Sequence, residues 1–235
     1  MSIRTSTLAL MPWLLAAALA VNAPTSLAQP VEGTDYKKLV PPQPTDSPGK
    51  IEVIEFFSYG CPHCNAFYPL INAWAAKLPK DVVFKRVAVS FNRPQWINLA
   101  RAYYALQATG DLPALDGALF HALHAENLKL FDEPSLASWV GSHGGNAERF
   151  TQAYTSFGVN SQTVQADQLA ERYLIDAIPA LAVNGTYLAI ADSTHGQDVY
   201  FTELIAHTDA LIARVRSETA ARSARKEPEA TGKAK

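Results

Sequence analysis

Hydrophobic residues follow two spacings along this chain, one typical of strands and one typical of helices. Residues 51–57 are almost continuously apolar, β-branched and aromatic, which predicts a short strand covered on both faces. Glu55 breaks the pattern deep inside this run. Residues 81–89 predict a second strand, and the pattern that begins at Cys61 and continues to about Lys77 predicts a helix between them.

The middle of the chain has helical spacing only. Apolar residues recur three or four positions apart within residues 96–123, and a shorter helical pattern follows at 135–140. Asn146 is a favourable N-cap for a further helix, which we expect to end at Gly158. Another helix is predicted over residues 161–173. This part of the chain therefore predicts roughly five consecutive helices without a strand.

Strand signals return near the C-terminal end. Residues 180–183 and 186–190 flank Asn184-Gly185, a dipeptide that supplies the positive φ angles of a tight hairpin turn. An amphipathic helix is predicted over residues 198–216. The element order is strand–helix–strand, a helical block, then strand–strand–helix. This order predicts an α/β fold in which a central sheet carries an all-helical insertion.

The first residues of the chain resemble an export signal. Arg4 precedes an apolar run from Leu8 to Val21, and small residues follow up to Ala28. We expect residues 1–28 to be a secretory signal peptide that is cut after Ala28. The apolar run is shorter than the roughly 20 residues that span a bilayer, which disfavours the alternative of a retained membrane anchor. An exported chain would fold in an oxidising compartment.

Composition refines this picture at two further places. Residues 29–50 are rich in proline and poor in hydrophobic residues, so we expect an extended N-terminal segment. Residues 217–235 lack apolar periodicity and predict a disordered basic tail, either a solvated extension or a site for an anionic partner. The formal net charge of −2 gives no basic surface for nucleic acid. We expect a monomer.

The sequence Cys61-Pro62-His63-Cys64 is the strongest chemical signal. Two cysteines three positions apart at a helix start can close a small disulfide ring, and Pro62 suits the first helical position. The free N–H groups and the positive dipole end of the helix would face the Cys61 sulfur and lower the pKa of its thiol. His63 can add a positive charge or a donor near that sulfur, whereas Cys64 should be less exposed.

Other interpretations of the cysteine pair remain open at this point. A structural disulfide is one, although a ring of four residues constrains an unfolded chain little. A structural zinc site needs four ligands and would have to recruit His121, His124 or His143. A copper-handling pair is another. We expect His121 and His124 to be a surface pair or a pair whose hydrogen bonds are satisfied, and we expect no metal.

The surroundings of the motif resemble a known family. Glu-Phe-Phe-Ser-Tyr-Gly precedes Cys-Pro-His-Cys, and Asp-Ala-Ile-Pro-Ala-Leu-Ala-Val-Asn-Gly follows much later, as in the DsbA family of periplasmic thiol:disulfide interchange proteins. The resemblance extends from about Val31 to Arg216. It implies a thioredoxin-like fold with an inserted all-helical domain. The thioredoxin parts would be residues 29–91 and 177–216, and the insertion residues 92–176.

The resemblance also implies roles for individual residues. Cys61 would be the attacking cysteine and Cys64 the resolving one. Ile178-Pro179 would be a cis peptide facing the disulfide, and the Ile178 backbone would pair with an extended substrate. From the residues alone, the alternative is that Pro179 only begins an edge strand.

Glu55 matches the buried acid that the family carries behind its active site. A buried carboxylate needs a partner, and the next strand offers Lys85 and Arg86. By the resemblance, Arg86 stands in place of the usual lysine, and an arginine holds its charge more firmly. Tyr68 stands where some relatives carry a second acid. We therefore expect Glu55 and Arg86 to tune the pKa values of the cysteines, with one acidic neighbour missing.

The implied function is donation of the Cys61–Cys64 disulfide to newly secreted proteins by thiol–disulfide exchange, without a cofactor. The implied partners are unfolded or folding proteins with free cysteines, and a DsbB-type membrane quinone reductase that reoxidises the pair. The sequence has no Gly-rich nucleotide motif, so it would not carry its own electron acceptor. The alternatives are a disulfide reductase or isomerase, which needs a higher Cys61 pKa, and a peptide-binding periplasmic chaperone, which does not need Cys61.

Overall fold

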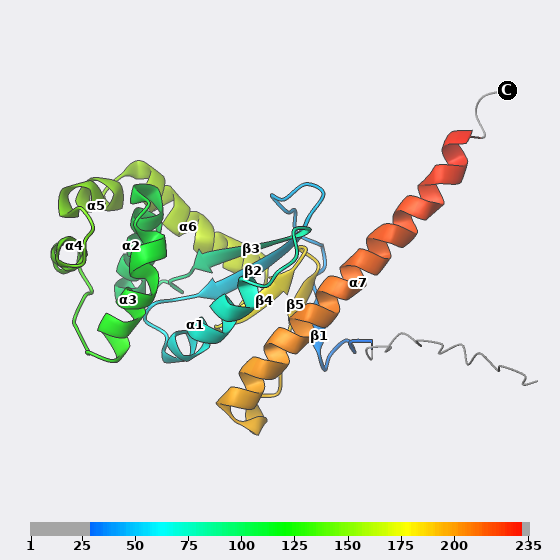
Figure 1. Ribbon diagram of the computed structural model, residues 1–235, viewed down its shortest axis with the longest axis horizontal. Helices are drawn as coiled ribbons and strands as arrows, with labels where there is room; N and C mark the ends of the chain where they lie inside the picture. The colour runs from blue at the N-terminus through cyan, green and yellow to red at the C-terminus, as the bar shows by residue number, and fades with distance from the viewer. Residues whose placement is uncertain (1–28, 232–235) are drawn as a thin grey trace, which may run out of the picture.

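The computed structural model describes residues 29–231, with side chains described for residues 29–225. Five strands form one mixed sheet in the order β1-β5-β4-β2-β3, shown in Figure 1. β2 and β3 are parallel, and the other neighbouring pairs are antiparallel. The strands are β1 (Tyr36–Lys38), β2 (Ile51–Phe57), β3 (Val82–Ala88), β4 (Ala180–Val183) and β5 (Tyr187–Ala189). The expected signal peptide, residues 1–28, lies outside the described residues.

The central strand β2 is buried along its whole length, as its nearly continuous apolar sequence predicts. Side chains alternate between its faces. Val53 packs in the cluster formed with α1 (Pro62–Ala75) and α7 (Gln197–Thr231), whereas Ile54 and Phe56 pack on the opposite face, against the end of α6. Helices therefore cover the sheet on both sides.

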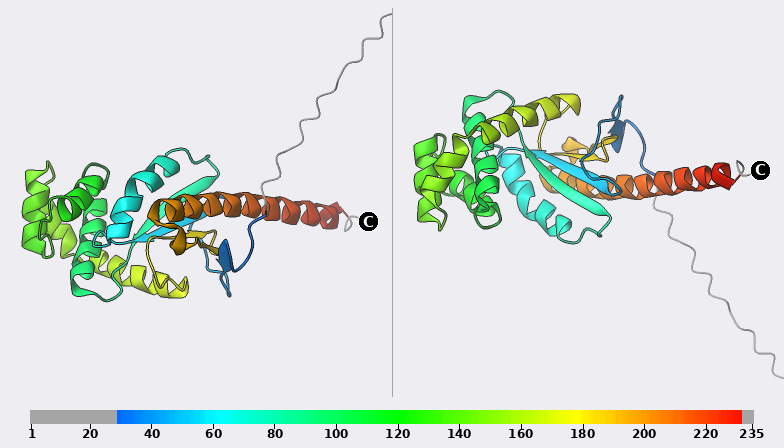
Figure 2. Two further views of the ribbon diagram at one scale, coloured as in Figure 1. Left: turned by 90° about the horizontal axis from the view of Figure 1, so that it is seen from below. Right: turned by 90° about the horizontal axis from the view of Figure 1, so that it is seen from above.

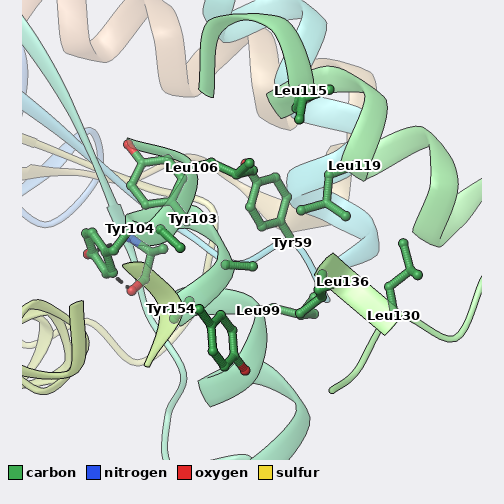
Figure 3. Close-up of a cluster of buried hydrophobic side chains, with 14 of the residues drawn as sticks. Tyr59, Leu99, Tyr103, Tyr104, Leu106, Leu115, Leu119, Leu130, Leu136 and Tyr154 are labelled. Atoms are coloured by element: carbon green, nitrogen blue, oxygen red, sulfur yellow. Dashed lines mark hydrogen bonds between the residues drawn. The ribbon is translucent and has the colours of Figure 1, made fainter. Parts of the chain in front are cut away.

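Five helices in succession separate β3 from β4, which confirms the helical block expected from the sequence. They are α2 (Pro94–Thr109), α3 (Leu112–His124), α4 (Glu133–Ser142), α5 (Ala147–Tyr154) and α6 (Phe157–Arg172). Helices α2–α5 gather beyond one end of the sheet in Figure 1. Figure 3 shows their core, in which Tyr59, from the turn before Cys61, packs among side chains of α2 and α3. The core of the helical block is thus continuous with the redox motif.

The N-terminal segment includes a feature that the sequence did not predict, the short strand β1. Tyr36 is buried, and its ring meets that of Tyr187 edge to face at 5.2 Å between centroids. β1 pairs with β5, about 150 residues later in the chain. A local hydrophobic pattern cannot reveal a strand of three residues whose partner is so distant.

Two helix boundaries differ from the sequence-based expectation. α5 begins after Asn146, whose side chain caps Arg149 N at 2.9 Å, as predicted. It ends at Tyr154, however, and the Ser156 hydroxyl caps the next helix through Val159 N. Gly158 therefore lies inside α6 and ends no helix. The serine cap outweighs the weak helix-stopping effect of this glycine.

The expectation of a disordered tail from residue 217 is wrong for the residues up to 231, because α7 continues as one helix to Thr231. Arg214 and Glu218 form an ion pair one turn apart at 3.0 Å, and Glu218 also accepts a hydrogen bond from Tyr187. The alanines that follow favour helix. Figure 2 shows the end of α7 projecting beyond the sheet. None of the helices within residues 29–231 has the length and hydrophobicity to cross a membrane.

The hairpin turn between β4 and β5 generates a stability prediction. Gly185 has a φ of +63°, and a Cβ there would overlap the backbone carbonyl of Gln43. Gly49 also has a positive φ, +73°, but a Cβ there would meet open space. We expect Gly185→Ala to lower the free energy of unfolding by about 3 kcal/mol and Gly49→Ala by only about 1 kcal/mol, measured by denaturant titration. Equal losses would show that the contact with Gln43 is unimportant.

Candidate active site

The start of α1 places the two cysteines one turn apart. Cys61 is the N-cap, with extended backbone (φ −94°, ψ 117°), and Pro62 occupies the first helical position as predicted. No side chain caps the first turn of α1, so the amide groups of that turn face the Cys61 sulfur. Both cysteines are free thiols, and their exposed fractions are 5% for Cys61 and 1% for Cys64.

The two thiols differ strongly in acidity. A hydrogen bond from the Cys64 thiol is the largest cause that lowers the pKa of Cys61, to about 6. The backbone amides of Cys64 and His63 and the charge of His63 also lower it, against the opposing effect of burial. Burial raises the pKa of Cys64, and the neighbouring Cys61 raises it further. The arrangement therefore stabilises a thiolate on Cys61 and a protonated thiol on Cys64.

The loop before β4 reaches the same sulfur from the opposite end of the chain. The Ile178–Pro179 peptide is cis, as the family resemblance implies. The Cys61 thiol lies 3.7 Å from the carbonyl oxygen of Ile178. Residues that are 117 positions apart thus meet at the redox pair.

His63 has a partner that the sequence did not suggest. Its Nδ1 donates to the side-chain oxygen of Gln197, the first residue of α7, at 3.0 Å. His63, Gln197, Ile178, Pro179 and Tyr200 line a hollow of about 400 Å³ beside the cysteines. Gln197 had no signal in the sequence, since only the packing of α7 against α1 brings it here.

Glu55 is fully buried next to Arg86, its neighbour in the parallel pairing of β2 and β3. The Arg86 Nε donates to Glu55 Oε2 at 2.6 Å, while Lys85 pairs instead with Glu52 at 2.7 Å. Burial raises the pKa of Glu55, although the charge of Arg86 acts in the opposite direction. The charge of Glu55 is also one of the causes that raise the pKa of Cys64, which connects this acid to the redox pair.

The acidic neighbour expected to be missing is present, but it comes from the helical block. Arg86 Nη1 donates to Asp116 Oδ2 at 2.6 Å, and the Tyr59 hydroxyl donates to Asp116 Oδ1 at 2.5 Å. Tyr68 packs beside them against Gly117, and burial, followed by the charge of Asp116, raises its pKa to about 12. Asp116 stands between the apolar residues of α3, and this interruption is the sequence signal that could have revealed it.

The histidines named as alternative zinc ligands have other partners. His121 is exposed and contacts Glu126 at 3.0 Å. His124 donates to the Tyr59 carbonyl at 2.7 Å, and His143 contacts the Trp139 carbonyl at 2.8 Å. Within residues 29–231, no group of three or more His, Cys, Asp or Glu side chains is arranged to hold a metal ion.

Comparisons with known proteins agree with the resemblance in sequence. A family model described as a DSBA-like thioredoxin domain matches residues 52–201. The thiol:disulfide interchange protein DsbA of Bordetella parapertussis is 43% identical over 181 residues, which cover 74% of this chain and 83% of the relative. The protein of the same name from Azotobacter vinelandii is 40% identical over 185 residues, covering 79% and 84%.

Solved structures show the same likeness. The crystal structure of Pseudomonas aeruginosa DsbA matches with a TM-score of 0.74 at 34% identity, covering 80% of this chain and 95% of that one. The oxidoreductase DsbA from Xylella fastidiosa matches with a TM-score of 0.73 at 29% identity, covering 80% and 99%. These findings confirm the thioredoxin-like fold with an inserted helical domain that the sequence predicted.

The acidity of Cys61 generates a pH prediction. Because its pKa is lowered, the Cys61 thiolate should be present at neutral pH and be lost as the pH falls through about 6. The pH dependence of alkylation and the ultraviolet absorbance of the thiolate both measure this midpoint. Cys64→Ala should raise the midpoint more than His63→Ala, since the Cys64 thiol supplies the largest lowering effect. A midpoint near about 8.5, the value of a free thiol, would contradict the arrangement described above.

Proposed function

Since the chain belongs to the DsbA-like thioredoxin family and is therefore a thiol:disulfide oxidoreductase, we propose that it oxidises newly secreted proteins with a disulfide formed by Cys61 and Cys64. Proteins of this family use a redox-active cysteine pair and act without a cofactor. The observation that carries the assignment to this pair is the unequal acidity of the two thiols at the start of α1.

The reaction begins when a substrate thiolate attacks the Cys61 sulfur of the disulfide. A bond forms between the two sulfurs, and Cys64 leaves as a thiolate that takes up a proton, because its pKa is raised. A second substrate thiolate then attacks the substrate sulfur of this mixed disulfide and expels Cys61. The substrate loses two electrons and two thiol protons. The enzyme keeps both electrons and one proton, and the other proton enters the solvent.

The stable Cys61 thiolate drives this exchange forward. A pKa of about 6 in place of about 9 favours the thiolate by about 4 kcal/mol. At pH 7 only the part of the shift below pH 7 stabilises the reduced form, by about 1.4 kcal/mol, which for a two-electron couple is about 30 mV toward a more oxidising potential. Because Cys61 has the more acidic thiol, it is also the better leaving group in the second step. Cys64 is almost fully buried and cannot easily meet a substrate.

The loop at Ile178 suits an extended substrate chain. The Ile178 carbonyl lies beside the Cys61 sulfur, so a substrate strand pairing there would carry its own cysteine to the attack position. The hollow of about 400 Å³ beside it could receive a neighbouring side chain of the substrate. Ile178 and Pro179 are therefore the proposed substrate-binding residues, while His63 and Glu55 with Arg86 would tune the thiols.

The reduced enzyme needs an external oxidant, and we assign this role to a DsbB-type membrane quinone reductase. A disulfide exchange of the same kind would regenerate the Cys61–Cys64 bond and pass two electrons to that partner.

DsbA relatives are periplasmic, and the proposed signal peptide fits that location. We expect N-terminal sequencing of the exported protein to begin at Gln29, because small residues precede the proposed cut after Ala28. Protein exported with Met1 retained would contradict cleavage.

The proposed reaction predicts that Cys61→Ser abolishes oxidation of a reduced, unfolded client such as hirudin. Cys64→Ser should also lose turnover. When its Cys61 thiolate attacks a client that already carries a disulfide, the client should release one thiolate and stay joined to Cys61 in a mixed disulfide that is visible on non-reducing gels. His207→Ala is a suitable control, since His207 contacts the Ile190 carbonyl and does not line the hollow beside the cysteines, so the change should leave activity unaltered. Full activity of Cys61→Ser would refute the assignment.

The reduction potential, measured in glutathione buffers, separates this function from its alternatives. A potential of about −120 mV would identify a disulfide donor, and a potential of about −270 mV would identify a reductase. Two results together would instead identify a chaperone. The variant with both cysteines replaced by alanine would still bind a cysteine-free peptide, and the wild type would show no oxidase activity.

A further inference from the structure

The buried cluster beside the redox pair contains more acid than base. Two carboxylates, Glu55 and Asp116, contact the single guanidinium of Arg86, each at 2.6 Å. All three side chains are shielded from solvent, with exposed fractions of 0%, 12% and 9% respectively. Two buried carboxylates cannot both ionise cheaply against one cation, so one of them keeps a proton.

The surroundings decide which carboxylate is ionised. Asp116 accepts hydrogen bonds at both oxygens, one from Arg86 and one from Tyr59. Glu55 is the more deeply buried, and its Oε1 has no hydrogen-bond partner among the described residues. Hydrogen bonds favour the charged form of an acid, and burial without partners favours the neutral form. Glu55 is therefore the carboxyl group of this cluster that carries the proton.

Several titratable groups on different elements face Glu55. Arg86 and Asp116 act on its charge directly, and Glu55 in turn influences the titration of Cys64 and Tyr103. Burial and the charge of Asp116 both raise the pKa of Glu55, whereas Arg86 lowers it. The groups around Glu55 and its two partners are Cys64 and Tyr68 of α1, Arg86 of β3, Tyr103 of α2, Asp116 of α3, and Tyr59 of the turn before Cys61; Tyr59 and Tyr68 act on Asp116 and Arg86.

Asp116 also belongs to a row of side chains on one face of α3 that contact Tyr59, near the active site. Asp116, Phe120 and His124 follow one another at intervals of four positions along α3, and all three contact Tyr59. Asp116 accepts from the Tyr59 hydroxyl, the Phe120 ring lies 4.7 Å from the tyrosine ring, and His124 donates to the Tyr59 carbonyl. Tyr59 is separated from Cys61 by one residue.

We propose that Asp116 is a positioning residue of the redox pair, through which the helical block controls Cys61 and Cys64. It pairs with Arg86, which leaves the proton on Glu55 near Cys64, and it accepts a hydrogen bond from the hydroxyl of Tyr59 ahead of Cys61. The proposal rests on the proposed function, because it assigns Asp116 to the same two cysteines.

The test removes the charge of Asp116 and keeps its shape. In Asp116→Asn, Glu55 is the carboxylate left on Arg86 and should ionise, which brings negative charge nearer to the cysteines. We expect the midpoint of Cys61 thiolate formation to rise, and the equilibrium constant for oxidising glutathione to fall by about threefold to tenfold. The infrared band of a protonated carboxylic acid, present in the reduced wild type at neutral pH, should disappear.

Two further variants separate this role from a purely structural one. Asp111→Asn changes the same residue type at the start of α3, where the carboxylate accepts from Thr109, and it should change neither readout. In a Glu55→Gln background, adding Asp116→Asn should no longer raise the Cys61 midpoint, because residue 55 cannot ionise. If that double variant does not fold, Tyr59→Phe removes one donor to Asp116 and should give a smaller shift in the same direction.

The proposal is overturned if Asp116→Asn keeps the carboxylic acid band and the wild-type midpoint. It is also overturned if the midpoint rises equally in the Glu55→Gln background or in Asp111→Asn. These readouts use the purified protein and need no client. A failure of the proposed function would appear instead in the wild-type potential and in the client assay with Cys61→Ser, so the two failures can be told apart.

Discussion

The hydrogen bond from the Cys64 thiol to the Cys61 sulfur is the interaction on which the chemistry of this protein depends. It is the largest of the causes that lower the Cys61 pKa, and it requires the two side chains to stay one helical turn apart. The Pro62 ring and the turn at Ser58 fix where α1 begins, since Cys61 N donates to the Ser58 carbonyl at 3.1 Å. The remaining structure keeps this pair buried, aligned and unequal in acidity.

The buried cluster of Glu55, Arg86 and Asp116 is hard to explain by stability alone. Buried ion pairs often contribute no more to folding than apolar side chains of the same volume, because desolvation offsets their attraction. Losing one partner is far more damaging, since it leaves a charge buried without compensation. Arg86 is further enclosed by aromatic rings, with its guanidinium 3.8 Å from the centre of the Phe57 ring. Such a cluster therefore tolerates little variation, and its position beside Cys64 gives a functional reason for keeping it.

Local patterns in the sequence were sufficient where the structure depends on neighbours along the chain. The strand with Glu55, the hairpin at Asn184-Gly185 and the start of α1 at Cys61 all follow from spacing, turn chemistry and capping. The family resemblance added the cis peptide at Ile178, which no local pattern would have favoured over an ordinary edge strand.

What the sequence did not reveal depends on distant packing or on many small terms. Gln197 meets His63 only because α7 lies against α1, across 134 positions of sequence. Asp116 reaches Arg86 only because α3 packs against α1 and α2 at the end of the sheet. The lack of an apolar stripe after residue 216 predicts a disordered tail. The helical propensity of its alanines and the ion pair of Arg214 with Glu218 nevertheless extend α7 beyond the last apolar position. Absence of periodicity thus argues against burial of a segment more strongly than against helix.

If Arg86 stands in place of a lysine, as the resemblance implies, a second acid has a clear role in this chain. A buried lysine can lose its proton, so a lysine paired with a glutamate can be neutral or charged as a unit. Arginine stays charged, and with Glu55 as its sole partner it would hold that acid ionised next to Cys64. Asp116 removes this constraint, because it satisfies the charge of Arg86 from the other side and frees Glu55 to carry a proton. Asp116, a residue of the helical block, thus makes up for both departures from the pattern that the resemblance implies: it balances the fixed charge of Arg86, and it supplies the acid that is absent at Tyr68.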